Sequence, residues 1–243
     1  MKILTFDSLP STNQYCELLD LDGYEEFTIF NAIEQTDGIG QRGNHWEAES
    51  GKNLTFSLIL KPTFLPIAEQ FQLTKCISLG IVDWLETLVP EGHKVSIKWP
   101  NDIYVEEKKI CGTLTSAKVS GNSITAAIAG IGINLNQRHF PEWVPNPISL
   151  VQIRACETDT SAALNDVAYA IELRYNQLRD NPNAPNCDYL SHLLHLGEER
   201  KYHYRGETIN AMITGVNRFG HLELLKPTGE SLVCQMKEIQ WIW

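Results

Sequence analysis

The sequence predicts an α+β fold in which a large first part is followed by a small all-β part. The segment 66–89 repeats apolar residues at the spacing of a half-buried helix. Several β-branched and aromatic segments between residues 27 and 135 are typical of strands. From Arg200 to Trp243, short strand-like segments alternate with turn residues, which favours a small β-barrel.

Each expected element has its own local signal. The segment 11–20 opens with capping residues and predicts a helix start, and apolar periodicity predicts a longer helix over 160–178. Alternating or continuous apolar runs predict strands at 27–35, 54–62, 95–99, 102–105, 109–119 and 123–135, with a hairpin turn at 120–122. The turn-rich segment 180–186 is a candidate linker between the two parts.

Composition narrows the classes of function. The formal net charge of −10 is unlike that of a protein whose main partner is nucleic acid. The chain has no apolar run long enough to span a bilayer, and its first residues do not resemble a signal peptide. Its six cysteines include no C-x-x-C pair, which favours reduced thiols. We therefore expect a cytoplasmic protein that does not bind membranes.

The polar loop 36–53 contains a misleading pattern. Gly38, Gly40 and Gly43 form G-x-G-x-x-G after a strand, but no helical periodicity follows and no acidic residue stands about 20 residues later. We therefore reject a dinucleotide-binding fold. The glycines still allow backbone N–H groups to approach an anion closely. The alternative is a merely flexible loop, against which Trp46 argues, because a large ring needs a packing surface.

Two further segments combine polar groups with strand-like surroundings. The segment "KWPNDIYVEEKK" places Lys98, Asp102 and Lys109 close together in the chain. Lysines and a carboxylate are the usual residues that bind phosphates and a metal ion. The alternative is that Asn101–Asp102 forms an ordinary turn and that the lysines are plain surface cations. Gly130 and Gly132 leave room for a ligand against a sheet, or they relieve crowding within a strand.

Four segments in this order resemble the biotin protein ligases: "STN" (11–13), "QTDGIGQRGNHW" (35–46), "KWPNDIYVEEKKICGTL" (98–114) and "GIGIN" (130–134). The most specific is "KWPND" with a lysine seven residues after its Asp. The resemblance implies a mixed β-sheet backed by helices, of the class II synthetase-like type, followed by an SH3-like β-barrel. It implies a biotin- and ATP-binding catalytic domain over 1–185 and the barrel over 197–243.

The resemblance also implies roles for individual residues. The catalytic residues would be Lys109, Gln41 and Arg42, and Asp102 would bind a metal ion. Biotin would be bound by Ser11, Thr12, Asn13, Gln35, Gly38, Ile39, Gly40, Gln41, Lys109, Gly112, Gly130 and Gly132. ATP would be bound by Arg42, Gly43, Asn44, Trp46, Lys98, Asn101, Asp102, Lys109 and Asn134. The family often has basic residues where Ile39, Gln41 and Asn44 stand, so this loop offers less positive charge to the reaction intermediate.

The implied activity is ATP-dependent biotinylation of a protein. With Mg²⁺, biotin and ATP would give biotinyl-5′-AMP, from which biotin passes to a lysine of biotin carboxyl carrier protein. Some members carry an N-terminal helix-turn-helix, but "STN" begins here at residue 11, so we expect a ligase that binds no specific DNA. The exposed strands expected of a mixed sheet favour a homodimer. The alternatives are a lipoate or octanoate ligase of related fold, and a non-catalytic module that binds a ligand and a protein.

Overall fold

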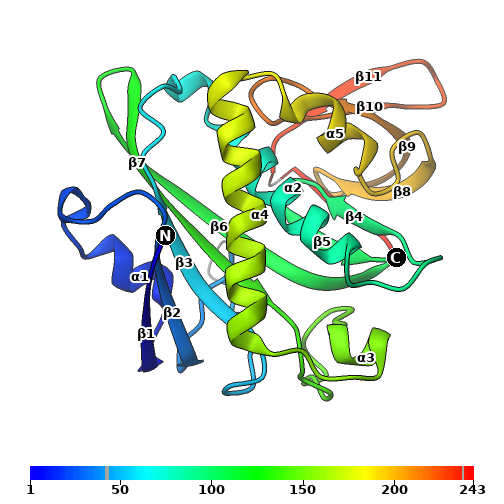
Figure 1. Ribbon diagram of the computed structural model, residues 1–243. Helices are drawn as coiled ribbons and strands as arrows, with labels where there is room; N and C mark the ends of the chain where they lie inside the picture. The colour runs from blue at the N-terminus through cyan, green and yellow to red at the C-terminus, as the bar shows by residue number, and fades with distance from the viewer. Residues whose placement is uncertain (42–43, 237) are drawn as a thin grey trace.

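The computed structural model describes residues 1–41, 44–236 and 238–243 and contains two β-sheets (Figure 1). Within the described residues, the large sheet has seven strands in the order β1-β2-β3-β7-β6-β5-β4. β1 runs parallel to β2, whereas the neighbouring pairs from β2 to β4 are antiparallel, so the predicted mixed sheet is confirmed. The strands are β1 (Lys2–Leu9), β2 (Thr28–Gln35), β3 (Leu54–Leu60), β4 (Val95–Lys98), β5 (Asp102–Val105), β6 (Lys108–Ser120) and β7 (Ser123–Ile133).

Sequence analysis missed strand β1. The segment contains Asp7 and Ser8, and its burial pattern lacks the regular alternation of a half-buried strand. β1 lies at the edge of the sheet, where only one neighbouring strand is available and none of its residues is fully buried. Its pairing with β2 therefore depends on tertiary contacts more than on its own apolar pattern.

Helices α2 (Phe71–Glu86) and α4 (Thr160–Asp180) cover one face of the large sheet, and α4 crosses in front of the strands in Figure 1. The expected helix at 66–89 is a short 3-10 turn (Ile67–Glu69) followed by α2 (Phe71–Glu86). The other helical segments are α1 (Thr12–Glu17), a 3-10 turn at Leu21–Gly23, α3 (Leu150–Arg154), α4 (Thr160–Asp180) and α5 (Pro185–Ser191). In the described part of the chain, no helix combines the length and the apolar composition that crossing a bilayer would require.

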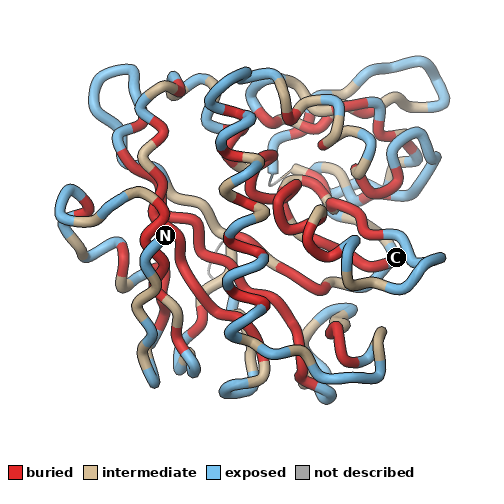
Figure 2. Tube along the Cα trace, in the orientation of Figure 1, coloured by how far each residue is buried: buried red, intermediate tan, exposed pale blue. Residues whose placement is uncertain are grey.

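Strand alternation separates two apolar clusters. In β3, Phe56 and Leu58 belong to the main core, whereas Ile59 belongs to a smaller cluster with Cys16 of α1. Because neighbouring side chains of a strand point to opposite faces, the main core under α2 and α4 fills one face of the sheet and the smaller cluster lies on the other. The central strands are accordingly buried on both sides (Figure 2).

The face that carries the smaller cluster also carries the glycines of β7. Ala126 and Ile128 belong to that cluster, and the next two residues of the same parity are Gly130 and Gly132. The sheet therefore presents side chains at one end of β7 and bare backbone at the other. This change along a single strand creates space above the sheet.

The C-terminal segment forms a separate antiparallel sheet. Its five described strands follow the order β11-β10-β9-β8-β12, with β8 (Glu199–Tyr204), β9 (Glu207–Val216), β10 (Leu222–Leu225), β11 (Ser231–Cys234) and β12 (Ile239–Trp241). This sheet packs on the first part of the chain. One contact between them is a hydrogen bond of 2.9 Å, which the indole N–H of Trp99 donates to the backbone carbonyl of Gly220. Helix α5 lies between the two predicted domains, whose boundaries stay a prediction.

Candidate active site

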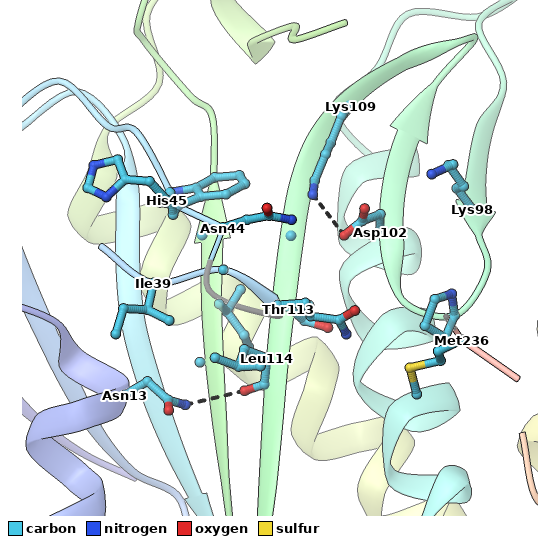
Figure 3. A pocket seen from close by; sticks show the side chains of 18 of the residues that line it. Asn13, Ile39, Asn44, His45, Lys98, Asp102, Lys109, Thr113, Leu114 and Met236 are labelled. Carbon is cyan, nitrogen blue, oxygen red and sulfur yellow. Dashed lines mark hydrogen bonds and ion pairs between the residues drawn. The ribbon is translucent and has the colours of Figure 1, made fainter. Parts of the chain in front are cut away.

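A cavity of about 340 Å³ lies on the glycine-bearing face of the large sheet (Figure 3). The loop 36–53, the hairpin between β4 and β5, strands β6 and β7, and the end of the C-terminal sheet all contribute to its wall. Fifteen of the residues expected to bind ligand line it: Ser11, Thr12, Asn13, Gln35, Ile39, Gly40, Gln41, Asn44, Trp46, Lys98, Asp102, Lys109, Gly112, Gly130 and Gly132.

The remaining site predictions have different outcomes. Gly38 and Asn101 do not line the cavity but contact residues that do, Trp46 and Gln41 respectively. Asn134 does not line it either, and its side-chain amide donates instead to the backbone carbonyl of Ile148 at 3.0 Å. Its position therefore indicates a structural role. Arg42 and Gly43 lie outside the described residues.

One end of the cavity is neutral and rich in hydrogen-bonding groups. Ser11 caps α1, and Thr12 donates from its backbone N–H (2.8 Å) and its hydroxyl (3.1 Å) to Oε1 of Gln35. The Thr12 hydroxyl also accepts from Ser57 at 2.9 Å, so its orientation is fixed. Asn13 donates to the carbonyl of Leu114 at 3.3 Å. Such an end suits an uncharged polar group of a ligand.

The floor of the cavity is made by glycines on adjacent strands. Gly112 of β6 and Gly132 of β7 are register partners, and the indole of Trp46 lies over both. A Cβ atom at Gly132 would collide with the indole, and one at Gly112 would come within 2.9 Å of it. Gly130 makes room for the Asn13 side chain in the same way, since a Cβ atom at Gly130 would lie 2.8 Å from Nδ2 of Asn13. Each glycine therefore allows a side chain to approach the sheet backbone.

The other end of the cavity is charged. Nζ of Lys109 lies 2.9 Å from Oδ1 of Asp102, and the same ammonium is 5.5 Å from the centre of the Trp46 ring. Lys98, on β4, is the register partner of Asp102. Burial is the main cause that lowers the pKa of Lys98, and Lys109 adds to it while Asp102 opposes both. Two cations and one carboxylate thus make this end positive in an acidic protein, which favours an anionic ligand.

A β-bulge selects which lysine faces the cavity. Ile103 pairs with Cys111, but the next residue of β5, Tyr104, pairs with Lys109, so Ile110 is an extra residue. Strict alternation would place Lys108 on the same face as Gly112, whereas the bulge places Lys109 there and leaves Lys108 exposed. The predicted choice of Lys109 over Lys108 agrees with this geometry.

Sequence reasoning missed the part of the wall that comes from the C-terminal sheet. Met236, Ile239, Gln240, Trp241 and Trp243 line the cavity, although the tail was expected to form a separate barrel. A cluster of tryptophans beside a polar site is a signal that could have been noticed. Other lining residues that were not predicted are His45, Trp99, Pro100, Thr113, Leu114 and Ile131.

The fold and the cavity define an α+β protein whose cavity has one neutral, hydrogen-bonding end and one end with two lysines. Comparison with known proteins narrows this class. The model of the biotin/lipoate A/B protein ligase family matches residues 5–134, more than half of the chain. The chain belongs to this family, as its four sequence segments predicted.

Individual relatives agree with this assignment. The bifunctional ligase/repressor BirA of Bacillus subtilis is 30% identical over 193 residues, which are 78% of this chain and 55% of that protein. The chain therefore spans about half the length of that relative. A biotin–[acetyl-CoA-carboxylase] ligase of Mycobacterium tuberculosis is 26% identical over 180 residues, covering 73% of this chain and 64% of that protein.

A solved structure matches almost from end to end. The biotin protein ligase of Aquifex aeolicus in complex with biotin and ATP is 26% identical, with a TM-score of 0.80, and the match covers 98% of this chain and 97% of that one. The predicted fold class is thereby confirmed.

Proposed function

We propose that the protein is a biotin protein ligase, which activates biotin as biotinyl-5′-AMP and transfers it to a lysine of biotin carboxyl carrier protein. The observation that carries this proposal is the layout of the cavity along β6 and β7. A neutral hydrogen-bonding end at Asn13 and Leu114 is joined across bare backbone to the Lys109–Asp102 pair. Biotin has matching chemistry, with an uncharged ureido ring at one end and a carboxylate at the other.

The first step brings two anions together. An oxygen of the biotin carboxylate attacks the α-phosphorus of ATP, the bond to the bridging oxygen breaks, and pyrophosphate leaves. Lys109 and Lys98 are placed to offset the repulsion between these anions, because both line the charged end of the cavity. Asp102 holds the Lys109 ammonium in place without leaving the end negative.

Magnesium would enter with the nucleotide. The described residues contain no group of three side chains that could hold a metal ion by themselves. Asp102 is the only carboxylate among the described residues that line the cavity, which suits a cation bound mainly by phosphates and water. Bound there, Mg²⁺ would neutralise phosphate charge.

In the second step the amine of the acceptor lysine attacks the acyl carbon of the adenylate. The acyl–oxygen bond breaks, AMP leaves, and the amine loses a proton as the amide forms. The mixed anhydride must be kept from water before this attack. The loop residues Ile39, Gly40 and Gln41 line the cavity together with Met236, from the connection between β11 and β12, and could exclude solvent there.

A pyrophosphate-release assay with Mg·ATP tests the first step. Biotin should stimulate release, whereas lipoate, octanoate and the absence of an acid should not. Stimulation by lipoate or octanoate alone would assign the chain to the lipoate-type members of its family. No stimulation by any acid would support a non-catalytic module. Mass spectrometry of carrier protein incubated with biotin and ATP tests the second step, with a mass increase on one lysine as the expected result.

A further inference from the structure

The ammonium group of Lys98 lies among three aromatic rings. Its Nζ is 4.7 Å from the centre of the Trp241 ring, 5.8 Å from that of Tyr104 and 5.9 Å from that of Trp243. Tyr104 belongs to β5, whereas both tryptophans come from the end of the C-terminal sheet. Attraction to the ring faces stabilises a cation at such distances, and more strongly when water is excluded.

Other aromatic contacts hold the three rings in place. Trp241 stacks on Trp99, with centroids 6.4 Å apart, and meets Tyr202 edge to face at 5.5 Å. Trp243 stacks on Tyr104 at 5.5 Å with an interplanar angle of 10°. Tyr104 is therefore buried beside Lys98 and Trp241 is half-buried, whereas Trp243 stacks on Tyr104 from a half-exposed position.

No carboxylate pairs directly with Lys98 among the described residues. Among the described residues, its Nζ makes no hydrogen bond and no ion pair within 4.0 Å, and its register partner Asp102 is paired with Lys109 instead. Burial lowers the pKa of this lysine, Lys109 lowers it further, and Asp102 raises it. The side chain nevertheless lines the cavity. A half-buried cation without a direct ion-pair partner, facing a cavity, is placed to receive an anion from a ligand.

We propose that Trp241 and Trp243 are positioning residues, which hold the Lys98 ammonium toward the cavity so that it binds the polyphosphate chain of a nucleotide. The identification of this anion as that of ATP depends on the proposed function. Ring faces stabilise the cation without neutralising it, whereas a carboxylate partner would compete with the phosphates. The C-terminal sheet thereby becomes a working part of the phosphate site.

Binding of inorganic tripolyphosphate and of ATP to the full chain, measured by calorimetry, tests this inference without biotin. Lys98→Met should weaken both affinities about 10- to 100-fold, the range expected when a charge-assisted hydrogen bond is lost. Trp243→Leu should weaken them about 3- to 10-fold, and Trp241→Leu somewhat more. Trp241→Phe, which keeps an aromatic ring, should retain most of the wild-type affinity for both ligands. The control is Phe219→Leu, an exposed aromatic residue of the same part of the chain, which should change neither affinity.

A double-mutant cycle separates positioning from a structural role. In a Lys98→Met background, Trp243→Leu should have no further effect on ATP affinity, because the group that it positions is gone. In the adenylation reaction, Trp243→Leu should raise KM for ATP and leave KM for biotin unchanged. Equal losses with and without Lys98 would overturn the inference, as would a wild-type chain that does not bind tripolyphosphate. If the Lys98 and tryptophan variants weaken tripolyphosphate binding as expected but biotin never stimulates pyrophosphate release, the proposed function fails and the phosphate-binding role of Lys98 stands.

Discussion

Lys109 and Asp102 form an ion pair, with 2.9 Å between Nζ and Oδ1, at the charged end of the cavity. The side chain of Lys109 also passes over Gly112, whose missing Cβ would lie 3.2 Å from Nζ. Three features therefore set the position of one ammonium group: a carboxylate, a glycine and the bulge at Ile110.

We predict that Lys109→Ala will lower the rate of adenylate formation about 100-fold or more, because a preorganised cation opposite developing phosphate charge is lost. Lys108→Ala is the matched control, since its side chain is exposed on the other side of the bulge. Biotin-dependent pyrophosphate release measures the rate, and thermal unfolding should show both variants folded. Equal losses in the two variants would show that Lys109 is not the lysine that acts.

We predict that two glycines of β7 affect different substrates. Gly130→Ala would press on Asn13 and should raise KM for biotin, whereas Gly132→Ala would displace the Trp46 indole and should raise KM for ATP. Each change should be about tenfold, and neither position has positive φ, so the effect is steric. Gly23→Ala, which meets open space, is the control. The same change in both constants for both variants would contradict two separate ends of the cavity.

We predict that Lys98→Met will raise Tm while it weakens ATP binding. The folded pKa of Lys98 is lowered, so at neutral pH the folded state carries the cost of a partly buried charge. Between the lowered pKa and the unfolded value of 10.5, the unfolded state binds more protons, and wild-type stability rises with pH. The Tm advantage of Lys98→Met should thus be largest near neutral pH and should narrow in the alkaline range.

Differential scanning calorimetry of both proteins, from neutral to alkaline pH, measures the difference in Tm. A difference of 1 kcal/mol in unfolding free energy corresponds to about 2–4 °C in Tm for a chain of this size. Lys94→Met removes the same charge from an exposed side chain and should show no comparable advantage. A Lys98→Met advantage that stays constant with pH would mean that packing, rather than charge burial, is responsible.

We predict that arginine in the loop will slow the escape of the adenylate. The Gln41 amide is neutral and donates to Oδ1 of Asn101 at 3.0 Å, so this position contributes no charge to the site. Gln41→Arg, alone or with Ile39→Arg, should slow dissociation of biotinyl-5′-AMP up to about tenfold, and high salt should reduce the gain. Filter binding of radiolabelled adenylate gives the rate, and Gln41→Met is the uncharged control. A gain for Gln41→Met would attribute the effect to apolar packing.

Local residue patterns were enough to predict most of the secondary structure, and short motifs were enough to predict the family. Apolar periodicity placed α2 and α4, and β-branched runs placed the strands from β2 to β7, because these elements are buried on at least one face. It failed at β1, whose exposed edge position leaves little apolar pattern. The polar and glycine residues around the cavity were found through motif resemblance, since their spacing along the chain alone also fits ordinary turns.

The way these residues meet depends on contacts between segments that are distant in the chain. The bulge at Ile110 turns Lys109 toward Gly112, and the register of β6 with β7 places Gly112 opposite Gly132 under Trp46. Packing of the C-terminal sheet on Trp99 brings Trp241 to Lys98, 143 positions earlier in the numbering. Register, bulges and contacts between sheets arise from pairing of distant segments, and no local pattern of residues encodes them.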